Sequence, residues 1–355
     1  MRVERIALRD FRSYEEAEFE VGPGLTIVHG ANGAGKTNLL EGLYFGCTGR
    51  SFRTSNDRQL VRHGAHTARA VVSGSDSDGA HELAVGIEPG QLKRMTSDGA
   101  PIERISDAPH RPLLSVFAPD RLDLVKGQPG VRRAHLDQFV AALWPARAAT
   151  RRTYNQALAQ RNALLGRVRS GRVGSDALIP WNVALAEAGV ALAADRLAAA
   201  ARIAAPFAQH AEELGLTGAS AVEYRSRSAQ EPDALADELA ARLESDLARG
   251  YTTHGPHRDD LELSRDGRDL RAFGSQGEQR LALLALLLAE RDALAAERSR
   301  PPLLLFDDVM SELDAGRRGR LSAALRRNGQ AVVTATEAEH VPGWDLDGVA
   351  RIAVP

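Results

Sequence analysis

The residue pattern with the clearest chemistry lies near the start of the chain, where residues 30–37 read GANGAGKT. This run matches the phosphate-binding pattern G-x-x-x-x-G-K-[ST] at every fixed position. Glycines let such a loop turn its backbone N–H groups toward phosphates, while Lys36 can reach the β and γ oxygens of ATP and Thr37 can hold Mg²⁺. We therefore predict ATP and Mg²⁺ as cofactors, with the nucleotide contacted by Gly30, Ala31, Asn32, Gly33, Ala34, Gly35, Lys36, Thr37 and Asn38.

The residues on either side of this loop support a nucleotide site. Leu25 to Val28 reads as a short apolar strand, and Leu39, Leu40 and Leu43 recur at the spacing of a helix core face. A strand, a glycine-rich loop and a helix in this order are the setting that the pattern requires. The alternative is a glycine-rich turn with an incidental lysine, and the flanking strand and helix disfavour it.

The second half of the same site is predicted far along the chain. Pro301 to Phe306 is a continuous apolar run without alternation, as expected for a parallel strand buried on both faces, and Asp307 and Asp308 follow it directly. Because open α/β sheets bind ligands at the carboxyl edge of their strands, Asp307 is placed to hold Mg²⁺ with Thr37. Asp308 is placed to orient an attacking water, so Asp308 and Lys36 are the predicted catalytic residues. Two acids in an exposed turn would not require an apolar strand before them.

The segment before that strand indicates a class of P-loop protein. Gly274 to Arg280 reads GSQGEQR and runs into the apolar sequence LALLALLLAE, a helix whose N-terminus would offer amides to an anion. By itself this segment could be a solvated loop before a core helix. Its spacing resembles the signature of ABC ATPases, however, and Ser311 to Asp314 (SELD) resembles their D-loop, in the order that ABC ATPases follow. We predict that the nucleotide is also contacted by Ser275, Gln276 and Gly277.

Further segments extend the resemblance along the chain: DFRSY at 10–14, SFRTSNDRQLVRHG at 51–64, PDRLDLVKGQPGVRRAHLD at 119–137 and THGPHRDDLEL at 253–263. Together with the nucleotide motifs they resemble the RecF family, bacterial recombination-mediator ATPases of the SMC-like ABC group. The resemblance implies an α/β fold, a P-loop ABC-ATPase head with an inserted, mainly helical second lobe. It also implies a DNA repair and replication protein of the SOS response that binds ATP and DNA, forms an ATP-dependent homodimer and hydrolyses ATP weakly. RecR and RecO are the implied partners, and placing RecA on gapped DNA is the implied role.

Two positions depart from the wider ABC pattern. Asp308 stands where most ABC enzymes carry glutamate, as it does in RecF proteins generally, and its shorter arm fits slow turnover. Thr334 to Thr336 follow the next apolar strand, where many ABC proteins place a switch histidine. The sequence therefore leaves the identity of the γ-phosphate sensor open.

Length and composition predict a two-lobed protein of the cytoplasm. A chain of 355 residues is longer than chains that fold around a single hydrophobic core usually are. We therefore predict two lobes, lobe I at 1–116 plus 300–355 and lobe II at 117–299. The net charge of −2 indicates neither nucleic acid nor membrane. The N-terminus MRVERIALRD carries charges where a signal peptide needs an apolar run, so we expect no membrane partner. Cys47 is the only cysteine, which excludes an internal disulfide.

Lobe II is predicted to contain a helical hairpin. Val131 to Leu214 is rich in alanine, leucine and arginine at helical spacing and is interrupted by glycines and Pro180, which predicts two arms of about 35 residues spanning about 50 Å. Tyr251 to Leu263 and Arg268 to Phe273 read as short strands. His254 and His257 in the first of these segments are spaced like a metal pair, but the Gly-Pro between them spoils helical geometry, so we assign them no metal.

Arginines are concentrated in the predicted hairpin. Nine of them lie between Val131 and Ser175 against a single acid, Asp137, and a second basic stretch follows the phosphate-loop helix. Arginine–phosphate contacts give affinity without sequence readout. No aromatic series alternates with these arginines, so duplex DNA, including gapped DNA or a single-strand–duplex junction, is favoured over single strands. The alternative is that the arginines only solvate alanine-rich helices. The predicted DNA contacts are Arg132, Arg133, Arg147, Arg151, Arg152, Arg161, Arg50 and Arg53.

Two other functions are compatible with the nucleotide motifs. One is the ATP-binding subunit of a membrane transporter, and the other is a nucleotide-gated adaptor whose hydrolysis is incidental. The two ATP halves of a transporter subunit are normally much closer in sequence than Lys36 and Asp307 are, which disfavours the first. The adaptor differs from an ATP-dependent DNA clamp only in its rates, so the sequence does not separate these two.

Overall fold

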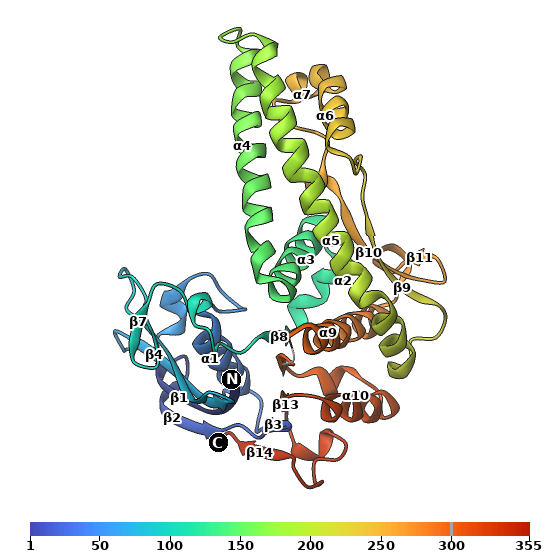
Figure 1. Ribbon diagram of the computed structural model, residues 1–355. Helices are drawn as coiled ribbons and strands as arrows, with labels where there is room; N and C mark the ends of the chain where they lie inside the picture. Colours follow the sequence, from blue (N-terminus) through green and yellow to red (C-terminus); the bar gives the residue numbers. More distant parts are fainter. Residues whose placement is uncertain (299–300) are drawn as a thin grey trace. The chain divides into compact units, whose positions relative to one another are not determined.

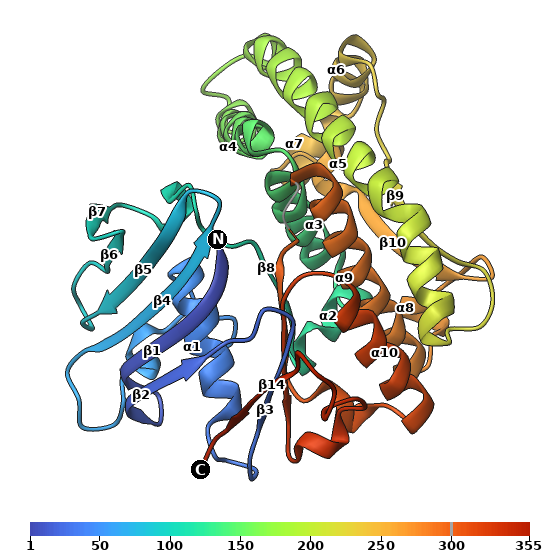
Figure 2. The same cartoon turned by 60° about the horizontal axis from the view of Figure 1, so that its bottom comes forward.

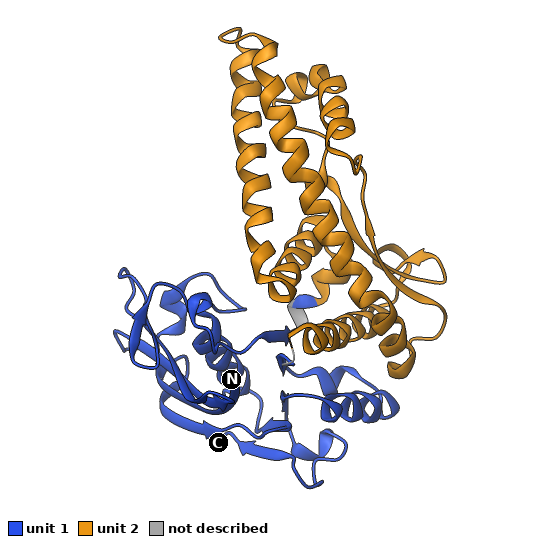
Figure 3. Ribbon diagram, viewed as in Figure 1, with its two compact units in different colours: residues 1–121, 299–355 blue, residues 122–298 orange. Residues whose placement is uncertain are grey.

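The structure is a computed structural model that describes residues 1–298 and 301–355 (Figure 1). Contacts divide the chain into two compact units, residues 1–121 with 299–355 and residues 122–298 (Figure 3). Both ends of the chain therefore build the first unit, and the second unit is inserted in sequence between them.

The sequence placed one boundary between these units after residue 116, whereas the observed division falls after Arg121. The other predicted boundary, at residues 299–300, lies outside the described residues. Each unit has its own secondary structure and core, so the two units can be described one at a time.

A five-stranded parallel sheet forms one side of the first unit. Its strand order is β14-β3-β13-β12-β8. All four residues of β12 are buried, which confirms the prediction of an apolar strand inside a parallel sheet. The five strands are β3 (Leu25–His29), β8 (Leu114–Phe117), β12 (Leu303–Phe306), β13 (Ala331–Ala335) and β14 (Ala350–Ala353).

A six-stranded antiparallel sheet forms the other side of this unit, in the order β2-β1-β4-β5-β6-β7. Buried and exposed residues alternate along much of β4, as expected for a sheet with one face against a core. The strands are β1 (Arg2–Phe11), β2 (Tyr14–Glu20), β4 (Ala68–Asp76), β5 (Gly79–Ile87), β6 (Arg94–Ser97) and β7 (Ala100–Ile102).

Helix α1 (Lys36–Thr48) packs against strands of both sheets and joins them in one hydrophobic core (Figure 2). Two glycines allow its close approach to the antiparallel sheet. A Cβ at Gly42 would lie 2.6 Å from Leu8 Cδ2, and a Cβ at Gly46 would lie 2.6 Å from Val72 Cγ2. Cys47 is buried in this core. The other helices of the unit are α10 (Ala315–Arg327) and the short 3-10 helices η1 (Asp57–Leu60), η2 (Ile105–Asp107), η7 (Val309–Glu312) and η8 (Ala338–His340). The 3-10 helix η3 (Pro119–Leu122) spans the sequence boundary between the two units.

The second unit is mainly helical and carries a small antiparallel sheet of order β11-β10-β9. Its centre is the long helix α5, which packs against α9, α4, α3, α6 and β9. The helices are α2 (Asp123–Lys126), α3 (Pro129–Leu143), α4 (Thr150–Arg169), α5 (Ile179–Leu214), α6 (Pro232–Ala241), α7 (Leu243–Arg249), α8 (Leu270–Phe273) and α9 (Gln276–Arg298). The strands are β9 (Ser220–Arg225), β10 (Asp260–Arg265) and β11 (Arg268–Asp269), and the 3-10 helices are η4 (Pro145–Ala149), η5 (Ser175–Leu178) and η6 (Pro256–Arg258).

The predicted helical hairpin is present as the pair α4 and α5, but its first arm is shorter than expected. The chain leaves α3 at Trp144 and passes through η4, which starts at Pro145, before α4 begins. Proline lacks the N–H that a continuing helix needs, so the arm is two helices instead of one. The second arm, α5, is continuous, with Pro180 in its first turn, where a missing N–H costs nothing.

The two predicted strands near the signature are only partly correct. Strand β10 begins at Asp260, and the preceding residues from Tyr251 form turns and η6 because Gly255 has a φ of 128° and Pro256 follows it. Residues 270–273 form a turn of helix, α8, after a two-residue strand.

The segment from Ser175 to Leu214 is long and apolar enough to cross a membrane by length and composition. Sequence analysis did not identify this segment. Several residues of α5 are buried against neighbouring helices, and Arg196 forms a buried ion pair with Asp137 at 2.7 Å. A core helix of a folded unit meets the same criteria, and the packing of α5 supports that interpretation.

Arg161 of α4 lies at the centre of a buried polar cluster. Its guanidinium donates to Asp246 Oδ2 and Thr252 Oγ1, both at 2.7 Å, and to Asn182 Oδ1 at 2.8 Å. Both charged side chains of the pair have no exposed surface. The prediction that Arg161 contacts DNA is therefore wrong, because its guanidinium is enclosed and already saturated by partners in its own unit.

Removing Arg161 should destabilise the protein. We expect Arg161→Ala to lower the free energy of unfolding by about 3–5 kcal/mol, because Asp246 would stay buried without its cation. Arg152 lies on the same helix but is exposed, so Arg152→Ala should change the free energy of unfolding by no more than about 0.5 kcal/mol. Urea denaturation followed by circular dichroism measures both variants. Similar small losses for the two would contradict the importance of the buried pair.

Candidate functional site

The loop between β3 and α1 has a backbone that only glycine accommodates at two positions. Gly30 has a φ of 156°, and a Cβ there would lie 2.2 Å from the carbonyl oxygen of Val354. Gly35 has a φ of 113° and stands at the N-cap of α1. A Cβ at Gly35 would meet the hydroxyls of Ser13 and Tyr14 at 3.0 and 3.1 Å. The turn between β1 and β2 thus presses against the loop and fixes its shape.

Lys36, the first residue of α1, folds back across this loop. Its ammonium group donates to the carbonyl oxygens of Gly30 at 2.7 Å and Ala31 at 2.8 Å. The cation therefore lies beside the backbone that the sequence predicted to surround phosphates. A lysine in this position can exchange its carbonyl partners for phosphate oxygens without moving the backbone.

The two side chains that the sequence predicted to hold Mg²⁺, Thr37 and Asp307, lie in contact, and Thr334 joins them. Thr37 Oγ1 donates to both carboxylate oxygens of Asp307 at 2.9 Å, and Thr334 Oγ1 of β13 donates to Asp307 Oδ1 at 2.9 Å. The strand order places β13 between β3 and β12, so all three residues meet at one carboxyl edge. Burial raises the pKa of Asp307, and the two hydroxyls partly offset this by stabilising its charge. A hydroxyl and a carboxylate are oxygen donors of the kind that Mg²⁺ prefers.

Asp308, the predicted catalytic residue, has a strained backbone and an exposed side chain. Its φ of 50° is uncommon for a residue other than glycine. The N–H of Asp308 donates to Thr334 Oγ1 at 2.8 Å, and its carbonyl accepts from Ser311 Oγ at 2.9 Å. Both ends of the residue are therefore held while its carboxylate stays accessible, an arrangement often found at functional sites.

A buried carboxylate beside the loop was missed by the sequence analysis. Glu41 of α1 has no exposed surface and accepts two hydrogen bonds from Arg12, at 2.9 and 2.7 Å. It also accepts from Ser51 Oγ at 2.5 Å and from Arg53 at 3.1 Å. Arg53 donates in addition to Asn38 at 3.0 Å. The sequence did contain a sign of this site, because Glu41 lies between Leu40 and Leu43 on the predicted core face of the helix. A carboxylate buried there requires a cationic partner.

The predicted signature residues stand at the start of α9. Ser275 and Glu278 form a reciprocal cap, in which Ser275 N donates to Glu278 Oε2 at 2.8 Å and Glu278 N donates to Ser275 Oγ at 3.3 Å. Gln276 is exposed and Gly277 is half-buried in the first turn. This end of α9 belongs to residues 122–298, whereas the phosphate loop and Asp307 belong to the first unit.

The remaining predicted DNA contacts differ in how free they are. Arg132 is buried and makes two hydrogen bonds to Asp260, at 2.8 and 2.7 Å, so its assignment to DNA is also wrong. Arg147 pairs with Asp195 at 3.0 Å, and Arg151 pairs with Asp137 at 3.2 Å. Arg50 and Arg152, by contrast, are exposed and make no ion pair with a described residue.

The fold and the site together define a P-loop ATPase head of the SMC-like ABC class. Residues 5–89 match a family model described as an AAA domain. A solved Smc head bound to the C-winged helix domain of ScpA has a TM-score of 0.59 at 16% identity, covering 95% of this chain and 90% of that chain, which is a likeness of fold. Within this class, nearly full-length relatives identify the family.

The chain is similar to two curated proteins named DNA replication and repair protein RecF. It is 38% identical to that of Kineococcus radiotolerans, covering 96% of this chain and 94% of the relative, and 40% identical to that of an Anaeromyxobacter species, covering 95% and 93%. A solved structure of the recombination mediator protein RecF with ATP in the RecFOR pathway has a TM-score of 0.83 at 26% identity, covering 95% of this chain and 92% of that one. The chain belongs to the RecF family.

Lys36 gives a direct test of the nucleotide site. We expect Lys36→Met to weaken ATP binding by about 10- to 100-fold or more, because methionine offers no charged donor to the β and γ phosphates. Lys126→Met removes an exposed lysine elsewhere in the chain and should leave ATP binding unchanged. Isothermal calorimetry on variants with unaltered circular dichroism spectra measures both. Equal affinities for the two variants would contradict the site.

Proposed function

We propose that this protein is an ATP-dependent DNA-binding recombination mediator. In this proposal its ATP-bound dimer clamps duplex or gapped DNA and, with RecR and RecO, promotes RecA loading in gap repair and the SOS response. Slow hydrolysis of ATP then drives release. The observation that carries the proposal is the meeting of Thr37, Asp307 and Thr334 beside the phosphate loop in a RecF-family chain. A cytoplasmic location is expected for this role.

The chemistry at the site follows from the residues around it. Lys36 would bind the β and γ phosphates, and the loop amides would bind the remaining oxygens. Thr37 and Asp307 would hold Mg²⁺, which when bound neutralises charge on the phosphates. Asp308 would orient the attacking water, and its short side chain supports weak ATP hydrolysis. We propose that DNA stimulates this hydrolysis. Thr334 connects Asp307 to the backbone of Asp308, so it is a candidate for sensing the γ-phosphate.

Dimerisation is proposed to depend on the start of α9. The exposed first turn offers N–H groups and the Ser275 hydroxyl to an anion, and the helix is long enough to carry a substantial dipole. In ABC ATPases this element completes the nucleotide site of a second subunit. We propose the same for Ser275, Gln276 and Gly277, so that ATP bound to one chain recruits another.

DNA binding is proposed to use exposed arginines on both units. Arg50 of the first unit and Arg152 of the second have free side chains, and Arg147, Arg151 and Arg133 could exchange their present partners for phosphates. Arg132 and Arg161 are excluded because both are buried. Contacts from such residues, on either unit, would bind DNA of any sequence with an affinity that falls as salt rises.

One experiment with two variants tests the clamp. Ser275→Arg should leave ATP bound to monomers but abolish ATP-driven dimerisation, because a bulky cation replaces the small hydroxyl at the helix N-terminus. Asp308→Asn should keep ATP binding and dimerisation while slowing hydrolysis by about 10²- to 10⁴-fold. Light scattering with and without ATP, followed by phosphate release and by binding to gapped DNA, measures the three properties. Wild-type dimerisation by Ser275→Arg would contradict the proposed signature.

A further inference from the structure

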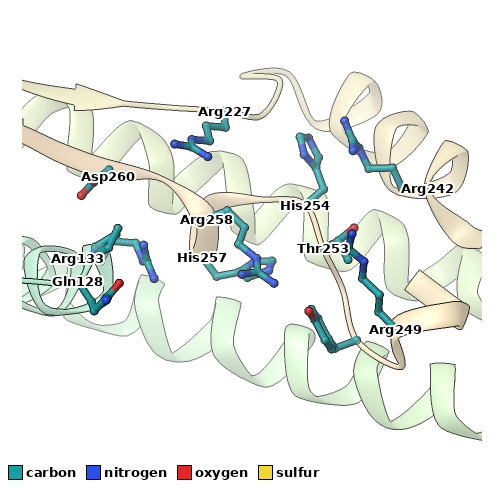
Figure 4. A pocket seen from close by; sticks show the side chains of 13 residues that line it. Gln128, Arg133, Arg227, Arg242, Arg249, Thr253, His254, His257, Arg258 and Asp260 are labelled. Atoms are coloured by element: carbon teal, nitrogen blue, oxygen red, sulfur yellow. The ribbon is translucent and has the colours of Figure 1, made fainter. Parts of the chain in front are cut away.

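The second unit contains a hollow of about 760 Å³ that is lined by an unusual number of cations (Figure 4). Its walls come from the start of α3, the segment after β9, the residue between α6 and α7, the end of α7, and the turns that lead into β10. Two of these segments, 119–137 and 253–263, are ones whose sequences resemble the RecF family. The arginines that line it are Arg133, Arg227, Arg242, Arg249 and Arg258.

The positive charge of this hollow is not neutralised within the described part of the protein. Of the described residues that line it, only Asp260 is acidic, and Asp260 already makes two hydrogen bonds to Arg132. Among the described residues, none of the five lining arginines forms an ion pair with a carboxylate. Burial lowers the pKa of Arg133, and the nearby cations of Arg196 and Arg258 lower it further, while the carboxylates of Asp260 and Asp259 partly offset these effects. Cations held together in this way repel one another unless an anion binds between them.

The type of cation and the concave shape indicate which anion fits. Arginine offers a planar fork of donors that suits phosphate, and none of the described lining residues is a lysine. The phosphates of an intact duplex lie on a convex surface, whereas a hollow admits an unpaired strand. Tyr251 at the wall is 43% exposed, and the Arg258 guanidinium lies 5.5 Å from its ring centroid. An exposed aromatic ring among arginines is the arrangement that binds single-stranded nucleic acid.

We propose that this hollow binds consecutive phosphates of an unpaired DNA strand, with Tyr251 stacking on a base. The proposal rests on the proposed DNA-binding function and assigns the single-stranded part of a gap to the second unit. It changes the expectation from sequence, which favoured duplex because no aromatic residues alternate with the arginines of the hairpin. Folding places Tyr251 in a hollow that also contains Arg133 and Arg227, which are distant from it in sequence.

Charge-matched variants of the full chain test this proposal. Arg227, Arg242 and Arg249 are exposed, so replacing all three with glutamine should leave the fold intact. We expect weaker binding of a fluorescent oligo(dT) in anisotropy titrations, a salt slope that flattens by up to ~0.7 for each phosphate that is no longer neutralised, and unchanged ATP affinity. Tyr251→Ala should weaken oligo(dT) binding by about 5- to 100-fold. The control replaces three exposed arginines outside the hollow, Arg167, Arg172 and Arg268, with glutamine.

The outcomes separate this proposal from the proposed function. If the hollow and control variants lose equal affinity for oligo(dT), or if the hollow variant loses only duplex affinity, the strand assignment is wrong while DNA binding stands. If inorganic phosphate at millimolar concentration displaces oligo(dT) from the wild type and Tyr251→Ala has no effect, the hollow is a small-anion site and the assignment is again wrong. If the wild type with ATP binds neither oligo(dT) nor duplex nor gapped DNA, the proposed function itself fails.

Discussion

The buried carboxylate of Asp307 constrains how the elements of the first unit are arranged. It is buried at the carboxyl edge of the parallel sheet and accepts hydrogen bonds from Thr37 at the start of α1 and from Thr334 on β13. A buried carboxylate is stable only when such donors surround it. Its position therefore requires that β12 and β13 lie side by side and that α1 begin at this edge. The phosphate loop is held in place by the same requirement.

Helix α1 transmits this constraint to the antiparallel sheet. Its two glycines allow close contact with β1 and β4, and its buried Glu41 binds Arg12 from the β1–β2 turn. That turn places Tyr14 against Gly35, where the tyrosine hydroxyl donates to the glycine carbonyl at 3.1 Å. A change at any of these contacts would alter the loop that is proposed to hold phosphate, although Gly35 is the only one of these residues that belongs to the phosphate-binding pattern.

The second unit uses its arginines in two physically different ways. Arg161, Arg132 and Arg196 are enclosed with Asp246, Asp260 and Asp137, where each pair joins segments that are far apart in sequence. The arginines of the hollow have no such carboxylates among the described residues. Buried charges must be paired to be tolerated, whereas exposed ones can stay unpaired until a ligand arrives. The same residue type therefore stabilises the fold in one place and presents a positive surface in another.

Local pattern determined much of the nucleotide site: the glycine spacing, Lys36, Thr37 and the apolar strand before Asp307 are all set by neighbours in sequence. The helical hairpin was predictable for the same reason, apart from the break at Pro145. Only the tertiary structure decided which arginines are buried, that Glu41 binds Arg12, and that Tyr251 lines the same hollow as Arg133 and Arg227. The periodicity of apolar residues indicates which face of a segment is buried and which is exposed. Charge pairing depends instead on which segments lie side by side after folding, and no local sequence pattern indicates those neighbours.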